Sequence, residues 1–195
     1  MKYQMLKDAN VEEIKGYYKS IQGKFNVEAE IPNCIFYNPT KVYVFDLWGL
    51  LDGNIQYVFN STKKTGEHEV LWIPKYNNIY ANEYMYINLN VAQIDFRELW
   101  DQNKLTIFLE QGCMFDLNGN WIIYFDLEEN IAILGVFSAS ISLNNFPISP
   151  HTEETFLDEY LMIPIEEIDK KNKILMKQYN QNFVKVFLEN YLKHD

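Results

Sequence analysis

The chain has 195 residues, of which 48% are hydrophobic and 16% aromatic, and its formal net charge at pH 7 is −10. This length and composition exclude an intrinsically disordered chain and predict a single folded domain over residues 1–195. The negative charge disfavours nucleic-acid binding, and no apolar run approaches the roughly 20 residues of a membrane-spanning helix. Residues 1–8 lack the apolar core of a signal peptide, so we expect a cytoplasmic protein without membrane contacts.

Four elements are predicted before residue 60. Apolar residues recur at helical spacing after a capping sequence, which predicts a helix over residues 10–22. Residues 27–31 alternate between apolar and polar side chains and predict a half-exposed strand. Residues 41–48 and 54–59 flank an Asp-Gly turn sequence, so we expect them to pair as a hairpin.

The next part of the chain predicts short elements separated by polar segments. Residues 61–67 are polar and predict a loop. Residues 68–73 and 84–89 are rich in apolar and aromatic side chains and predict strands. Residues 95–100 predict a short helix, and residues 105–109 lead into the central strands.

A three-stranded meander is the feature around which the rest of the fold is predicted to assemble. Asn-Gly at 118–119 separates two apolar runs and favours the positive φ angles of a two-residue type I′ turn. We therefore predict a hairpin over residues 113–125, in which Phe115 faces Ile122. The apolar run 131–137 predicts a third strand that is covered on both faces. These strands are expected to form the centre of the sheet.

The C-terminal part of the chain is predicted to be mostly helical. Residues 138–142 could extend the third strand, and Thr152 is a candidate N-cap for a helix over residues 152–161. Apolar spacing then predicts a long terminal helix over residues 165–191. The sequence therefore predicts an α+β fold, a mainly antiparallel sheet with N- and C-terminal helices packed on it.

The acidic residues are concentrated in one third of the chain. Residues 105–169 contain twelve Asp and Glu residues and no Lys or Arg, whereas the rest of the chain has fifteen acids and all 17 basic residues. A concentrated negative field attracts basic surfaces, although the same residues could serve only as a solubilising face. Turns and helix starts project charge outward, so the candidate binding residues are Glu128, Glu129, Glu153, Glu154, Asp158 and Glu159.

The sequence contains no motif of a known catalytic or metal site. His68, His151 and His194 are scattered without metal-ligand spacing. Cys34 and Cys113 lie in apolar surroundings without a C-x-x-C pattern, so we expect buried free thiols. We therefore predict a protein that is not an enzyme and that has no metal ion or cofactor.

Two alternatives remain open at this stage. Asp46 and Trp48, together with Trp72, could form a small-ligand or carbohydrate-binding module or a hydrolase site, because sugars bind to carboxylates beside aromatic rings. A deep pocket in which two carboxylates converge would support that interpretation. A structural role in a larger assembly would instead require a broad apolar surface patch.

Residues 115–124, followed by residues 131–135, resemble a hairpin that recurs in small bacterial proteins. These proteins include the immunity proteins of contact-dependent inhibition and polymorphic toxin systems. The resemblance implies a single-domain, acidic, non-catalytic protein that binds a basic toxin domain in the cytoplasm. Together with the charge distribution, it leads to the hypothesis of an inhibitor that neutralises a cationic toxin, which we expect to be a nuclease, through the carboxylates of residues 105–169.

Overall fold

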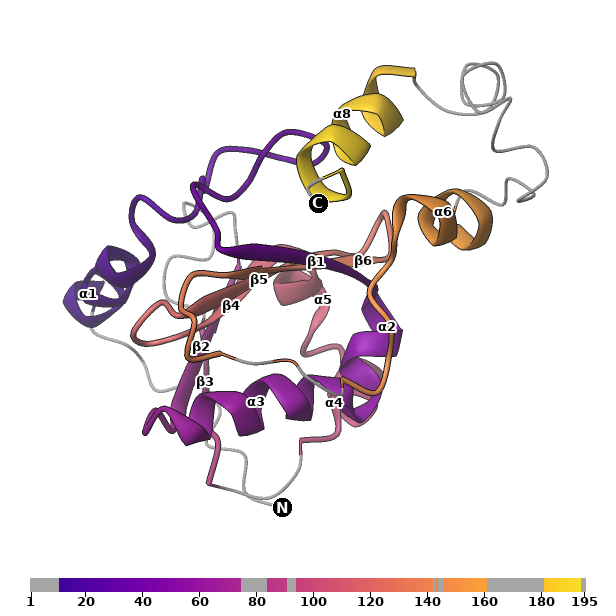
Figure 1. Ribbon diagram of the computed structural model, residues 1–195. Helices are drawn as coiled ribbons and strands as arrows, with labels where there is room; N and C mark the ends of the chain where they lie inside the picture. The colour runs from indigo at the N-terminus through magenta and orange to yellow at the C-terminus, as the bar shows by residue number, and fades with distance from the viewer. Residues whose placement is uncertain are drawn as a thin grey trace.

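The chain forms one antiparallel sheet with helices on both faces (Figure 1), which confirms the predicted α+β architecture. The computed structural model describes residues 11–74, 84–90, 94–141, 143, 146–160 and 181–193. The helices are α1 (Val11–Ile21), α2 (Leu47–Gly49), the π-helical turn η1 (Leu50–Asn54), α3 (Ile55–Lys64), α4 (Phe96–Asp101), α5 (Thr106–Leu109), α6 (Glu153–Thr155), the π-helical turn η2 (Phe156–Tyr160) and α8 (Gln181–Tyr191).

The sheet has six strands in the order β1-β6-β5-β4-β2-β3, and every neighbouring pair is antiparallel. The predicted meander occupies its interior, and Phe115 pairs with Ile122 as expected. Of the strands described, β1 and β3 form the two edges. The strands are β1 (Lys41–Asp46), β2 (Glu69–Ile73), β3 (Met85–Asn88), β4 (Glu110–Asp116), β5 (Trp121–Asp126) and β6 (Ile131–Val136).

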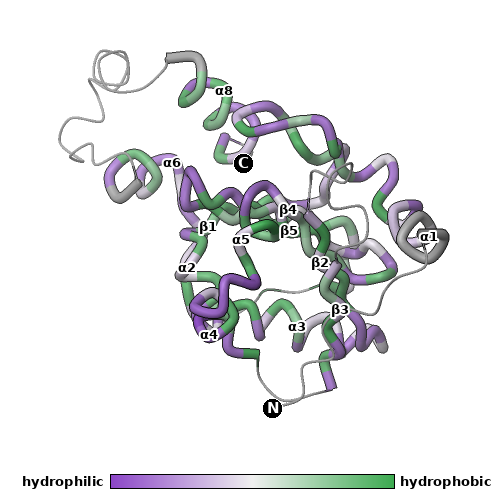
Figure 2. The backbone as a smooth tube through the Cα atoms, turned by 180° about the vertical axis from the view of Figure 1, so that it is seen from behind, coloured by the Kyte–Doolittle hydropathy of each residue, from purple (hydrophilic) through white to green (hydrophobic). Residues whose placement is uncertain are grey.

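Each face of the sheet has its own hydrophobic core. Neighbouring strand residues alternate between the faces, so Tyr124 belongs to the core beneath α8, whereas Ile123 belongs to the core beneath α3. The strands β5 and β6 are buried along their whole length because helices and loops cover both sides. Figure 2 shows hydrophobic residues predominating along β2, β3 and β5.

The predicted hairpin of residues 41–48 and 54–59 is wrong in its second half. β1 forms as expected, but the chain then continues through α2 and η1 into α3. The Asp46 carboxylate accepts a hydrogen bond from the backbone N–H of Gly49 at 2.5 Å, which begins the helical turn. The Asp-Gly pair does not reverse a hairpin, because Asp52 and Gly53 (φ 90°) form a kink within η1 and the chain then continues into α3.

The helical signal in this region was present in the sequence. Its buried residues recur at intervals of three and four, as expected for an amphipathic helix rather than a strand. The same helix includes the start of the predicted loop 61–67, since α3 ends at Lys64. The buried side chains are Leu47, Leu50, Leu51, Ile55, Val58, Phe59, Ser61 and Thr62.

The turn of the central hairpin is longer than predicted. Only Gly119 of the Asn-Gly pair has a positive φ (64°), and its N–H donates to the carbonyl of Asp116 at 2.8 Å. The buried Asp116 carboxylate also accepts from the backbone N–H of Asn120 at 2.6 Å. This carboxylate stabilises a loop of residues 117–120 in place of the two-residue type I′ turn.

Two other strand predictions are wrong. Residues 27–31 form turns, and the only pairing described near them is an isolated bridge between Phe25 and Phe36. Residues 138–141 also turn, with the N–H of Ile141 donating to the carbonyl of Ser138. Short alternating segments predict strands poorly when no neighbouring strand is available to pair with them.

The remaining predicted elements agree with the structure to within about two residues at their ends. These are the helices at 10–22 and 95–100 and the strands at 68–73, 84–89 and 131–137. Thr152 caps α6 as predicted, and α8 is the last part of the predicted terminal helix. Most of the helix predicted at 165–191 lies outside the described residues. No helix that the structure describes has the length and apolar character needed to cross a membrane.

Candidate functional site

The turn between β5 and β6 carries the first two candidate glutamates. At its start, the buried Asp126 carboxylate accepts hydrogen bonds from the backbone N–H of Glu129 at 3.0 Å and from the Tyr124 hydroxyl at 3.2 Å. At its end, Asn130 adopts a left-handed conformation with φ 53°. Asp126 and Asn130 therefore fix the backbone at the two ends of this turn. Between them, Glu128 is exposed and Glu129 is half-buried.

The start of α6 carries the next two candidate residues, Glu153 and Glu154. Thr152 and Thr155 form a capping box, in which each hydroxyl accepts from the other residue's backbone N–H. The apolar residues that follow are buried in the core, so the first turn faces outward, with Glu154 exposed and Glu153 half-buried. The helix dipole also favours carboxylates at this position.

β1 brings these two segments to the same end of the sheet. The side-chain amide of Asn130 donates to the Asp46 carboxylate at 2.6 Å, which connects the β5–β6 turn to the end of β1. The backbone N–H of His151 donates to the carbonyl of Val44 at 2.7 Å, which connects the segment before α6 to the same strand. Val44 and Asp46 are two residues apart, or about 7 Å along a strand. We refer to Glu128, Glu129, Glu153 and Glu154 as the acidic edge.

The other two candidate residues lie further along the chain. Asp158 is half-buried within η2. The backbone of Glu159 belongs to the same helical turn, but its side chain lies outside what the structure describes.

Not every acid of residues 105–169 contributes to the surface charge. Asp116 and Asp126 are 0% and 4% exposed, respectively. Burial raises the pKa of both carboxyl groups, although hydrogen bonds from their own turns partly oppose the shift. The surface of this segment is therefore less negative than a count of its acidic residues indicates. Glu166, Glu167 and Asp169 lie outside the described residues.

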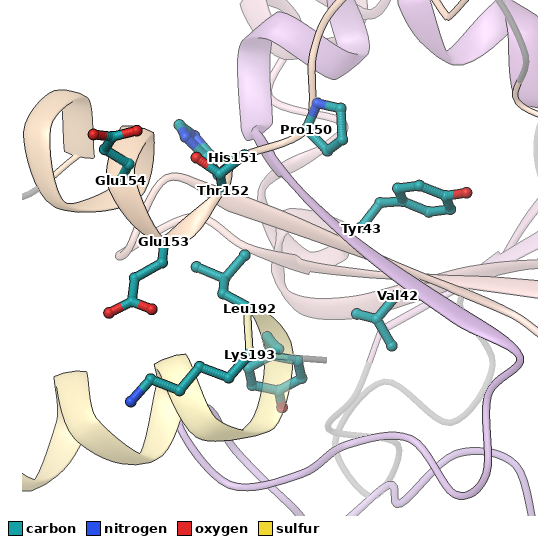
Figure 3. Close-up of a pocket in the computed structure, with 10 residues that line it drawn as sticks. Val42, Tyr43, Pro150, His151, Thr152, Glu153, Glu154, Leu192 and Lys193 are labelled. Atoms are coloured by element: carbon teal, nitrogen blue, oxygen red, sulfur yellow. The ribbon is translucent and has the colours of Figure 1, made fainter. Parts of the chain in front are cut away.

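A pocket of about 680 Å³ lies beside the acidic edge (Figure 3). It is bounded by β1, by the segment from Pro150 to Glu154 and by the end of α8. Lys193 and Glu153 extend toward the same side of this pocket in Figure 3. The pocket was not predicted from the sequence, because its walls come from distant segments. β1 lies more than 100 residues before the other two walls along the chain.

The alternative cluster of Asp46, Trp48 and Trp72 is not arranged as one open site. Trp72 is 0% exposed and its indole N–H donates to the carbonyl of Phe108 at 3.1 Å within the core. The Asp46 carboxylate already accepts from Gly49 and Asn130. Trp48 is half-buried, so it is the only one of the two tryptophans with surface available to a ligand.

Asp52, the other carboxylate of that region, is engaged in a salt bridge. The Arg97 guanidinium donates to both of its carboxylate oxygens at 2.7 Å, and these hydrogen bonds hold the pKa of Asp52 below its ordinary value. The same guanidinium lies 4.1 Å from the centroid of the Trp48 ring. Sequence reasoning missed this pair, although Arg97 is the only arginine in the chain.

The pocket next to this salt bridge has a volume of about 440 Å³ and contains two carboxylates, Asp52 and Asp95. Asp95 caps α4 by accepting from the backbone N–H of Glu98 at 3.0 Å. Both acids therefore have structural hydrogen bonds.

The remaining reactive side chains are dispersed. Burial raises the pKa of the Cys113 thiol, which is buried as predicted. The prediction of a buried thiol is wrong for Cys34, which is exposed. His68 is exposed beside β2, His151 lines the pocket near β1, and His194 lies outside the described residues. Within the part of the chain that the structure describes, no three His, Cys, Asp or Glu residues are grouped to hold a metal ion.

The acidic edge and the adjoining pocket are thus the surface features that unite separate parts of the chain. No protein-family model, no curated protein and no solved structure matches this chain.

Proposed function

We propose that this protein is an immunity-type inhibitor that binds and neutralises a basic toxin domain in the cytoplasm through the acidic edge. The observation that carries the proposal is that two glutamate pairs, about 25 residues apart in sequence, lie at the same end of β1. The toxin is expected to be a nuclease, because an enzyme that binds phosphodiesters needs a cationic surface. The proposal assigns no catalytic residue and no cofactor to this chain.

The exposed carboxylates would act mainly on the rate of association. Glu128 and Glu154 are exposed and therefore solvated, so each contributes little binding energy but adds to a long-range field. Glu129 and Glu153 are half-buried, and a partner that covers them would desolvate the resulting charge pairs. Such desolvated pairs can couple by several kcal/mol, with about 1.5–7 kcal/mol measured at one other interface.

The test uses the purified toxin domain encoded beside this gene and measures association and dissociation rates at low and high salt. Removing two charges with Glu128→Gln and Glu154→Gln should slow association by about threefold to tenfold at low salt. The matched control, Glu98→Gln with Asp101→Asn, removes two exposed charges from α4 and should leave the rate nearly unchanged.

Two results would contradict the proposal. The first is no complex at micromolar concentration in low salt. The second is an equal effect of the test and control variants, which would mean that net charge matters but the acidic edge does not.

A further inference from the structure

β1 is an edge strand of the sheet. Along it, the backbone N–H and C=O groups of successive residues point alternately toward β6 and away from the sheet. The N–H of Leu47 donates to the carbonyl of Asn130 beyond the end of β6, so the odd-numbered residues of β1 direct their backbone groups toward β6. The even-numbered residues direct theirs away from the sheet. The hydrogen bond from His151 N–H to the outward carbonyl of Val44 agrees with this alternation.

Val42 is the even-numbered residue that precedes Val44. By the same alternation, both its N–H and its C=O point outward from the sheet. Among the residues that the structure describes, no hydrogen bond joins either group to a residue outside the sheet. An unpaired edge of this kind is a template for one additional strand.

The open edge lies in the pocket beside the acidic edge (Figure 3). One wall is the segment from Pro150 to Glu154, which already pairs with β1 at Val44, and the other is the end of α8. A segment that pairs with Val42 would therefore extend the hydrogen bonding to β1 that begins between His151 and Val44.

The charges around the pocket favour a basic segment. Glu153 and Glu154 line the pocket, and Glu128 and Glu129 lie in the turn that is bonded to Asp46 of β1, whereas Lys193 is the one basic side chain among the lining residues described. A segment that carries Lys or Arg next to its pairing residues would satisfy both the open backbone groups and the surrounding carboxylates.

We propose that the Val42 edge of β1 binds an extended Lys- or Arg-bearing segment of the partner protein by strand addition. This inference deepens the proposed function and rests on it for the identity of the partner. Main-chain hydrogen bonds to Val42 hold the segment, and the glutamates select its charge.

The test uses three acetylated and amidated hexapeptides, which separates it from the test with the toxin domain. The first alternates valine with lysine, the second alternates valine with glutamate, and the third is the lysine peptide with its valine amides N-methylated. Each is titrated into ¹⁵N-labelled full-length protein, to concentrations on the order of 1 mM, since an isolated short strand binds weakly. Amide shifts identify the site.

The lysine peptide should shift the Val42 amide and its neighbours, and the glutamate and N-methylated peptides should bind at least about fivefold more weakly. Val42→Pro removes the outward N–H without breaking a bond to β6 and should abolish the shifts around residue 42. Val42→Thr keeps the N–H and a branched side chain, so it should bind like the wild type. Thermal melting and the ¹⁵N spectra verify that both variants fold.

Equal binding of the N-methylated peptide, or unchanged binding by a folded Val42→Pro variant, would show charge attraction alone and overturn strand addition. Shifts located away from β1 would also overturn it. A dimer in sedimentation analysis that Val42→Pro abolishes would mean that a second copy is the occupant. If the peptides fail while the toxin domain binds, the edge proposal falls and the proposed function remains.

Discussion

The two turns of the central meander begin alike and differ in what they present to solvent. The sequence Asp-Leu-x-x-Asn occurs in both, at residues 116–120 and 126–130, and in each case the aspartate at the strand end is buried. Its carboxylate accepts backbone N–H groups of the turn. The two variable positions are Asn-Gly in the first turn and Glu-Glu in the second.

The backbone conformation explains why position 119 of the first turn cannot carry a side chain, whereas position 129 of the second turn can. In the first turn the left-handed residue is Gly119 (φ 64°), and a Cβ there would lie 2.5 Å from the carbonyl oxygen of Ser20. In the second turn the left-handed residue is Asn130 (φ 53°), so the two variable positions need no glycine. Carboxylates of one acidic segment therefore have separate roles: the aspartates hold the turns and the glutamates form the acidic edge.

The largest expected effect comes from removing a buried turn carboxylate. Asp116→Ala deprives the N–H groups of Asn120 and Trp121 and the Asn120 side-chain amide of their acceptor. We expect a loss of about 2–3 kcal/mol in the free energy of unfolding, measured by urea denaturation, because unsatisfied buried donors are costly.

Asn118→Ala is the control within the same turn, since it removes only an exposed hydrogen bond to Glu67. It should cost about 0.5 kcal/mol or less. Equal losses in the two variants would mean that the buried carboxylate does not hold the turn.

A second effect should appear in the pH dependence of stability. Burial raises the pKa of Asp126, so the folded state keeps a proton at pH values where the unfolded chain, with a pKa of about 3.9, has released it. Proton binding by Asp126 therefore stabilises the folded state. This stabilisation is fully present below the unfolded-state pKa and is lost as the pH rises through the folded-state pKa. The Asp126→Asn variant cannot ionise at this position, so its free energy of unfolding does not fall in this way as the pH rises.

The unfolding free energy of Asp126→Asn should therefore rise relative to the wild type between pH 4 and pH 7. The expected gain is about 1.4 kcal/mol for each unit that folding adds to the pKa. Urea denaturation at several pH values measures it, with the exposed replacement Glu98→Gln as control. A difference that is flat with pH, or that falls as pH rises, would contradict the effect of burial on Asp126.

The smallest effect on stability is expected at the acidic edge itself. Glu128→Gln combined with Glu154→Gln alters two exposed side chains and should change the free energy of unfolding by no more than about 0.5 kcal/mol. The same pair of substitutions should slow association with the toxin domain. A large loss of stability would instead mean that these glutamates stabilise the folded state, as the buried aspartates do. The proposed difference between the two groups of acids would then be wrong.

Local sequence patterns were sufficient to predict the strands of the central meander, the strands at 68–73 and 84–89 and the cap of α6. They failed at α3, where an Asp-Gly pair was given more weight than the helical spacing of the buried residues. They also failed at residues 27–31, because strand formation depends on an available neighbour and not on alternation alone.

The sequence by itself determined that this protein has an α+β fold and that its excess of acidic residues lies within residues 105–169. Only the tertiary structure decided which carboxylates are buried and which lie together, since this depends on hydrogen bonds between distant residues. The bond from His151 to Val44 and the bond from Asn130 to Asp46 each connect positions more than 80 residues apart. No local pattern encodes such contacts, because they form only when the strands and loops pack around both faces of the sheet.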